Sequence, residues 1–133
     1  MTLLSPGKPA RTRSFWADVK VDNTVYDLYT CPPNCRAEVT VLHIVNANGN
    51  TSVYLYWNIT ADNVPDDLKA TYPTGYTSNI LGGKNMSSGD YVLISGATFV
   101  LQPGDKIQVK SVGAASPHVD ALCTVTETFI PVG

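Results

Sequence analysis

The sequence predicts an all-β fold, a single antiparallel β-sandwich of jelly-roll or immunoglobulin-like type with about eight strands. Three observations predict it. Apolar and polar residues alternate along most of the chain, which places every second side chain on one face of a strand. Turn-forming residues interrupt this alternation at intervals of roughly 8–12 residues. No segment carries the apolar stripe of period 3.6 that a packed helix needs.

The chain divides into a short arm and one domain. A length of 133 residues is usual for a single domain. We expect an extended N-terminal arm over residues 1–14, because this stretch has two prolines, a glycine and three basic residues without periodicity, and a sandwich domain over residues 15–133. Deleting the arm is expected to leave the stability of the domain nearly unchanged.

The arm is predicted to bind a neighbouring subunit. Its apolar side chains would be buried there, and its basic side chains would meet carboxylates. This makes the following residues candidates for an interface: Leu3, Leu4, Lys8, Arg11 and Arg13. The alternative is an arm that folds back onto its own domain.

The first strands of the predicted sandwich lie at residues 15–21, 37–45 and 51–60. The odd-numbered side chains from Ala37 to Val45 are expected to share one face, and Leu42 and Ile44 add apolar groups to the other. An Asn-Gly pair after this strand favours a hairpin turn. The next strand alternates well, with an inward set formed by Val53, Leu55, Trp57 and Ile59.

Further strands are expected at residues 91–95, 98–101, 106–112 and 119–129. Residues 61–76 are rich in loop formers and have room for one helical turn over residues 65–70. The segment Gly82-Gly83-Lys84-Asn85 is interpreted as a flexible turn. The predicted core is the inward set of the alternating strands, namely Val39, Val41, Val53, Leu55, Trp57, Ile107, Val109 and Val125.

Charge and hydropathy exclude several classes of protein. Charged residues make up 15% of the chain, well below the usual value of about 25%. The first 14 residues carry +3 and the remainder, with 6 basic and 11 acidic side chains, carries −5, so we expect no nucleic-acid binding. No apolar run is long enough for a secretory signal or a membrane span, so we expect synthesis in a cytoplasm and no membrane partner.

The residues that carry enzyme chemistry are sparse. His43 lies in mid-strand and is interpreted as a packed or interface residue, and His118 as a solvated loop residue. No Gly-x-Ser-x-Gly elbow is present, and the Gly82-Gly83 segment lacks the first glycine and the Ser/Thr of a phosphate loop. The sequence therefore predicts no catalytic residue, no cofactor and no metal ligand.

Cysteines and aspartates leave weaker alternatives. Cys31, Cys35 and Cys123 are expected to be free thiols, because a structural zinc site needs a second close pair of ligands and a cytoplasm disfavours disulfides. A disulfide between Cys31 and Cys35 is the alternative. A loop calcium on Asp62, Asp66 and Asp67 is disfavoured, because the spacing lacks the glycine and the distal glutamate of the helical-loop motif.

Tyrosines supply a second group of candidate interface residues. Tyr54 and Tyr56 lie on the outward face of their strand, and Tyr72 and Tyr76 lie in the long loop. Exposed tyrosine is enriched at protein interfaces, which we favour, and it also stacks on sugar rings.

The order of motifs resembles a broad group of small bacteriophage structural proteins. The carrying residues are the stretch Leu28-Tyr29-Thr30-Cys31-Pro32, a strand, Asn46-Ala47-Asn48, an alternating strand, and finally Leu101-Gln102-Pro103-Gly104-Asp105-Lys106-Ile107-Gln108-Val109. The resemblance covers roughly residues 25–128. The Cys31–Cys35 segment and the 61–76 loop depart from the group's pattern, which leaves the position in the particle open.

This resemblance implies a β-sandwich built into virions. It implies a capsid decoration (cement) protein that binds the major capsid protein or other virion proteins, with a head–tail, tail or fibre component as the alternative. Because the outer faces of the predicted sandwich are poor in charge and rich in tyrosine, we also expect a homo-oligomer, and we favour a trimer. A lectin-like, glycan-binding module is the competing class, and an enzyme is not expected.

Overall fold

The computed structural model describes residues 10–130, apart from the side chains of Ala97 and Thr98. Two 3-10 turns, η1 (Ala61–Asn63) and η2 (Asp66–Leu68), lie between the fourth and fifth strands. The strands are β1 (Ala10–Val19), β2 (Tyr26–Thr30), β3 (Cys35–Asn48), β4 (Thr51–Ile59), β5 (Tyr76–Met86), β6 (Tyr91–Leu101), β7 (Lys106–Val112) and β8 (His118–Phe129).

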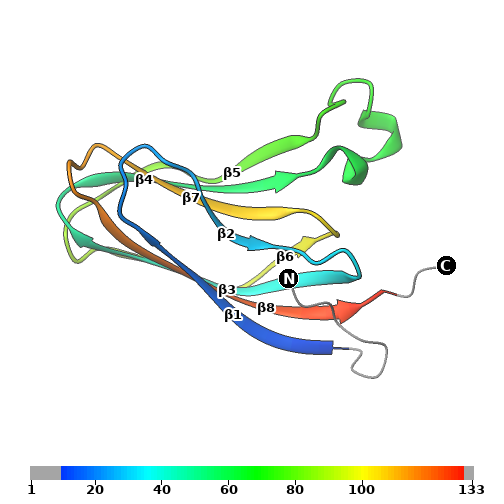
Figure 1. Ribbon diagram of the computed structural model, residues 1–133, viewed down its shortest axis with the longest axis horizontal. Coiled ribbons are helices and arrows are strands. Elements are labelled where there is room, and N and C mark those ends of the chain that lie inside the picture. The colour runs from blue at the N-terminus through cyan, green and yellow to red at the C-terminus, as the bar shows by residue number, and fades with distance from the viewer. Residues whose placement is uncertain (1–9, 131–133) are drawn as a thin grey trace.

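The strands form two four-stranded antiparallel sheets that pack face to face (Figure 1). The first sheet has the order β1-β8-β3-β6, and the second has the order β2-β7-β4-β5. The pairs β1–β8, β2–β7, β3–β6 and β4–β5 lay the first half of the chain beside the second half in reverse order. This nesting of antiparallel pairs across two sheets is the jelly-roll topology, the first of the two sandwich types expected.

The core lies between the sheets and is aliphatic. Val39, Val53, Leu55, Ile107, Val109 and Val125 are buried as predicted. Trp57 is only half-buried, and it packs edge-on against Phe99 with ring centroids 5.7 Å apart. Its indole nitrogen is buried without a hydrogen-bond partner among the described residues. Val41, the remaining predicted core residue, lies on the opposite face of its strand.

A β-bulge at Thr40 corrects the predicted face of β3. Up to Val39 the odd-numbered side chains point into the core, but the pairing with β8 then jumps from Val39 opposite Val125 to Val41 opposite Thr124. After this extra residue the even-numbered side chains, Leu42 and Ile44 among them, are buried. A bulge inserts one residue on one strand and so exchanges the two faces beyond it.

The boundary of the predicted arm at residue 14 was wrong. β1 begins at Ala10, opposite Thr128, and pairs with β8 residue for residue without a shift. Residues 10–14 are therefore part of the first sheet. The signal in the sequence was the period-two placement of Arg11 and Arg13, which continues the inward positions of Phe15 and its successors.

Two local expectations also change, and a third is confirmed. Gly82-Gly83 is not a turn, because β5 runs through it with two register shifts against β4. The two strands expected at residues 91–95 and 98–101 are one continuous strand, β6, whose pairing with β3 is irregular between Val39 and Val41. Residues 65–70 hold a single 3-10 turn, as expected for that segment. Within residues 10–130 no helix is long and apolar enough to cross a membrane.

Candidate interaction surfaces

Four side chains form a row across the outer face of the first sheet. Trp16 stands opposite Leu122, Leu122 opposite His43, and His43 opposite Leu93. We call these four residues the apolar row. Trp16 is 74% exposed and Leu93 is 56% exposed. Because the Thr40 bulge turns His43 outward, all four strands of the sheet contribute to one surface.

The apolar row has aromatic and hollowed surroundings. Tyr91, itself exposed, packs edge-on against His43 with ring centroids 6.3 Å apart. Beside Trp16 lies a hollow of about 340 Å³, walled by side chains of the row together with Val45 and Asp120. A single exposed apolar side chain needs no explanation, but a contiguous patch with a hollow beside it is typical of an interaction site.

A polar cluster borders this face where β1 ends and β8 begins. His118 Nε2 lies 3.3 Å from Asp18 Oδ1 and 3.4 Å from Asp120 Oδ1, and Lys20 Nζ lies 3.2 Å from Asp18 Oδ2. Among the described residues, Asp18, His118 and Asp120 are a group whose donor atoms lie close enough together to hold a metal ion. The two carboxylates are direct cross-strand neighbours, and Lys20 places a positive charge beside Asp18.

At the other end of β1, Glu127 holds a buried ionic centre. The carboxylate has no exposed surface, and it accepts hydrogen bonds from Arg11 Nε at 2.7 Å and Arg13 Nε at 2.8 Å. Tyr29 donates its hydroxyl to the same carboxylate at 2.6 Å. The Arg13 guanidinium also lies 4.8 Å from the centre of the Phe15 ring. These contacts fasten the start of β1 to the core.

The electrostatics of this centre follow from its partners. Burial acts to raise the pKa of Glu127, but the hydrogen bonds from Arg13, Tyr29 and Arg11 outweigh it, so the pKa lies below its ordinary value. Burial and the bond to the glutamate raise the pKa of Tyr29. The hydrogen bond to Glu127 likewise raises the pKa of Arg13. The centre is therefore a charged, satisfied structural unit rather than a proton-transfer site.

The predicted pair Tyr54 and Tyr56 lies on the outer face of the second sheet. Their rings are stacked, with centroids 6.1 Å apart and an interplanar angle of 15°. Lys110 Nζ lies 4.7 Å from the centre of the Tyr54 ring and 5.8 Å from that of Tyr56. The Tyr54 ring also lies against Gly83, where any Cβ would collide with it. Both rings are half-buried.

Tyr72 and Tyr76, predicted in the long loop, lie together at the other end of the second sheet. Their rings meet edge-on with centroids 5.1 Å apart. They line an apolar pocket of about 250 Å³, which we call the loop pocket and which is formed by Ile59, Val64, Pro65, Leu68, Tyr72 and Tyr76.

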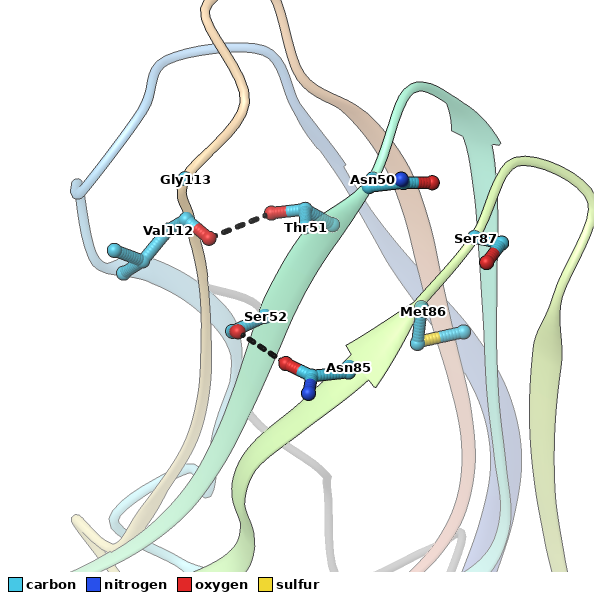
Figure 2. Close-up of a pocket in the computed structure, with 8 residues that line it drawn as sticks. All are labelled: Asn50, Thr51, Ser52, Asn85, Met86, Ser87, Val112 and Gly113. Carbon is cyan, nitrogen blue, oxygen red and sulfur yellow. Dashed lines mark hydrogen bonds between the residues drawn. The ribbon is translucent and has the colours of Figure 1, made fainter.

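A polar recess of about 360 Å³ lies between the ends of β4, β5 and β7 (Figure 2). Thr51 donates its hydroxyl to the Val112 carbonyl at 3.0 Å, and Ser52 donates to the Asn85 side-chain oxygen at 2.8 Å (Figure 2). These hydrogen bonds link β4 to β7 and β5. Because the polar side chains are bonded to one another, the recess offers few free hydrogen-bonding groups to a ligand.

The three cysteines are buried thiols. Cys31 Sγ lies 3.3 Å from the Cys35 carbonyl oxygen, and no disulfide joins any of the three. Burial raises the pKa of both Cys31 and Cys123 to about 12. Since the thiolate is the reactive form, burial and the raised pKa lower the reactivity of Cys31 and Cys123 while the fold is intact.

The structure thus divides the predicted site residues into three groups. Arg11 and Arg13, expected to reach a neighbour, contact the chain's own glutamate, because a buried carboxylate requires cations. The four tyrosines form two separate pairs: Tyr54 and Tyr56 on one sheet face, and Tyr72 of the loop with Tyr76 at the start of β5. Leu3, Leu4 and Lys8 lie outside the described residues.

Sequence reasoning missed the apolar row and the Asp18–His118–Asp120 cluster. Trp16 and Leu93 each carry a signal, since a large apolar residue stands on the polar side of an alternating strand. The partnership of these side chains depends on the strand register and on the bulge, which the sequence pattern did not reveal.

Comparison with known proteins supports the fold alone. No protein-family model matches the sequence, and no curated protein matches it. A chain of the infectious bursal disease virus Gx strain aligns over 97% of this chain and 37% of its own length, with 10% identity and a TM-score of 0.52. A mutant VP2 protein of the same virus, from derived T=1 particles, aligns over 95% and 35%, with 10% identity and a TM-score of 0.50.

A third similar chain comes from the capsid structure of Helicobacter pylori bacteriophage KHP30. It aligns over 91% of this chain and 89% of its own, with 17% identity and a TM-score of 0.48. This chain spans little more than a third of the length of the bursal disease virus chains. The strand order defines the chain as a jelly-roll domain, and the two bursal disease virus matches support this fold.

Proposed function

We propose that this protein is a non-enzymatic virion structural protein, a capsid decoration (cement) protein that binds the major capsid protein or other neighbouring virion subunits. Its place of action is then the virion, and its partners are proteins rather than nucleic acid or membrane. The fold supports this proposal, since jelly rolls recur in viral capsid proteins. Head–tail, tail or fibre proteins are the nearest alternatives within the same class.

The apolar row is the observation that carries the proposal. Trp16 and Leu93 project from a sheet face that the chain's own second sheet does not cover. Tryptophan and tyrosine dominate binding energy when an interface desolvates them. A four-stranded face with an apolar centre and polar margins suits the surface of another folded subunit better than it suits a small ligand.

The test substitutes the exposed side chains of the row. Particles grown with Trp16→Ser combined with Leu93→Ser are expected to carry at least about tenfold less of this protein, because truncating an interface anchor costs about 2 kcal/mol or more. Quantitative mass spectrometry of purified particles measures the occupancy. Val25→Ser is the matched control, since Val25 is 48% exposed and lies outside this face. Unchanged occupancy of the double variant, with the melting temperature preserved, would count against the proposal.

Glycan binding is the competing function, and the second sheet bears on it. A sugar would have to stack on Tyr54 and Tyr56, yet Lys110 already lies over both rings. The geometry therefore favours a role for these tyrosines in packing or protein contact. Saturable binding on a glycan array that Tyr56→Ala abolishes would reverse this preference.

The oligomeric state belongs to the same proposal. We favour a trimer over a dimer because of the charge-poor, tyrosine-bearing outer faces and the resemblance to virion components. Native mass spectrometry of the protein released from particles tests this directly. A monomer both in solution and on release would contradict it.

A further inference from the structure

We propose that the loop pocket receives the N-terminal segment, residues 1–9, of a neighbouring copy of this chain. The inference rests on the assembly role proposed above and names a contact between copies of the protein. The pocket supplies the site, and the composition of the segment supplies the occupant.

The loop pocket is apolar and open. Val64 forms its buried base, and Leu68, Tyr72 and Tyr76 stand on its rim with 43%, 37% and 49% of their surfaces exposed. Apolar side chains that converge on a hollow and remain exposed gain free energy when another apolar group covers them. The pocket therefore suits aliphatic side chains.

Backbone hydrogen bonds hold the pocket in shape. The Leu68 amide donates to the Pro65 carbonyl at 2.8 Å, and the Tyr72 amide donates to the Leu68 carbonyl at 2.9 Å. Gly75 closes the loop at a φ of 101°, where a Cβ would collide with the Ile59 carbonyl oxygen. A site that exists before binding loses little ordering entropy, which favours a short, weakly structured occupant.

The charges on the turns beside the pocket select a basic partner. Asp66 and Asp67 lie on η2, the turn whose Leu68 lines the pocket, and Asp62 lies on η1, two residues before the lining residue Val64. Lys69 pairs with Asp66 at 3.5 Å, whereas Asp62 and Asp67 form no ion pair within residues 10–130. The occupant should therefore combine aliphatic groups with positive charge.

Residues 1–9 have this composition. Leu3 and Leu4 are adjacent aliphatic side chains, Lys8 follows four residues later, and the segment contains no acidic residue. With Leu3 and Leu4 in the pocket, an extended chain would place Lys8 about 13 Å away, at the level of the surrounding acidic turns. The segment thus matches both the apolar and the electrostatic character of the site.

The position of β1 favours the pocket of a neighbour. β1 begins at the same end of the sandwich as the loop between β4 and β5 (Figure 1). It is an edge strand that packs over β2, however, whereas the pocket lies beside β5 at the far edge of the other sheet. Within one chain the segment would have to cross the whole end of the sandwich. A copy packed against the β1 edge presents its pocket without that crossing, and nine extended residues reach about 30 Å.

A peptide titration tests the site and its occupant. A fluorescent peptide of residues 1–9 is added to the full chain carrying Leu3→Asp and Leu4→Asp, so that its own segment cannot compete. We expect saturable binding by fluorescence anisotropy, and at least a tenfold loss of affinity when Leu68→Asp is added. Val25→Asp, a change at a comparably exposed residue on another surface, should leave binding unchanged. No binding, or binding that Leu68→Asp leaves intact, overturns the proposal.

A mixing experiment tests whether the partner is a neighbour. The segment variant (Leu3→Asp, Leu4→Asp) and the pocket variant (Leu68→Asp) each lack one half of the contact, so each alone should be monomeric by native mass spectrometry. An equimolar mixture should form a heterodimer, because one intact segment meets one intact pocket. If the mixture stays monomeric although the peptide binds, the segment occupies its own chain's pocket and the neighbour is refuted. Both experiments use protein without particles, so they can fail or succeed independently of the Trp16 test.

Discussion

At the scale of single residues, the most consequential feature is one buried carboxylate. Glu127 forms ion pairs with both Arg11 and Arg13, whose side chains are 21% and 29% exposed, while its own side chain has no exposed surface. Tyr29 completes the set from the facing sheet. Removing one member of such a cluster leaves the others with desolvated, unsatisfied groups, which costs far more than an exposed ion pair contributes.

We expect Glu127→Gln to destabilise the protein by about 3 kcal/mol, because two partly buried guanidinium groups lose their counter-charge. Urea unfolding of wild type and variant measures this. Asp120→Asn, on the same strand but 61% exposed at its side chain, should stay within about 0.5 kcal/mol of wild type. Equal midpoints for Glu127→Gln and wild type would show that the centre does not stabilise the fold.

The same residue should make stability sensitive to acid. Because the pKa of Glu127 is lowered in the folded protein, the unfolded chain binds this proton more readily. The stabilisation is present above the ordinary glutamate pKa of about 4.3 and is lost as the pH falls through the folded value. The free energy of unfolding of wild type should therefore fall more steeply than that of Glu127→Gln below about pH 4. Parallel curves would contradict this assignment.

At the scale of elements, the start of β1 at Ala10 determines how much stability an N-terminal truncation should remove. The first nine residues precede the sheet, whereas residues 10–14 bring five positions of strand pairing and both arginines of the Glu127 centre. Removing residues 1–9 should leave the free energy of unfolding within about 0.5 kcal/mol of wild type. Removing residues 1–14 should cost at least about 3 kcal/mol. Thermal melts of the two truncations decide it, and identical melts would place the functional boundary at residue 14 after all.

The elements also show how far the sequence could be interpreted. The alternation over residues 51–60 and 106–112 correctly predicted that Val53, Leu55, Ile107 and Val109 are buried, because period two is a direct consequence of strand geometry. Towards the end of β4 the agreement weakens, since Trp57 and Ile59 are only half-buried. The same alternation gave the wrong face for the second half of β3. The bulge at Thr40 exchanges the two faces of the strand, and no turn-forming residue in the sequence indicates it. The prediction for β1 failed for another reason. Its inward arginines look polar in the sequence, although most of their side-chain surface is buried and both guanidinium groups contact Glu127.

The site was predicted less well than the fold. The two tyrosine pairs could be predicted from the sequence, because residues two or four positions apart in a strand or loop remain close in space. The apolar row joins four strands that are distant in sequence, so it exists only once the register of the whole sheet is known. The same holds for His118, whose partner Asp18 comes from the opposite end of the chain.

At the scale of the whole molecule, the jelly roll couples the ends of the chain. β1 pairs with β8 and β2 pairs with β7, so the first and last strands of the chain close the same body. Cys31 follows β2 and Cys123 lies in β8, and both thiols are buried in one continuous core. We therefore expect the domain to unfold as one cooperative unit.

Thiol labelling tests this cooperativity. Opening free energies obtained from the labelling rates of Cys31 and Cys123 should agree with each other and with the free energy from urea unfolding, because neither thiol can react until the core opens. Mass spectrometry after timed alkylation resolves the two sites. Much faster labelling of Cys31 than of Cys123 would reveal that the β2–β3 corner opens by itself.

The regularity of β1 has a consequence for how copies of this protein avoid sticking together. Each sheet ends in two edge strands, and an exposed edge is a template onto which another chain can add. β2 is short and shifted in register, β5 is shifted twice, and β6 is broken in its pairing, so all three are poor templates. Within residues 10–130, β1 is the edge that runs ten residues without an interruption. If these domains form fibres or exchange strands at high concentration, the new strand pairing should form along β1. A proline at a β1 position whose backbone N–H points away from β8 should prevent it.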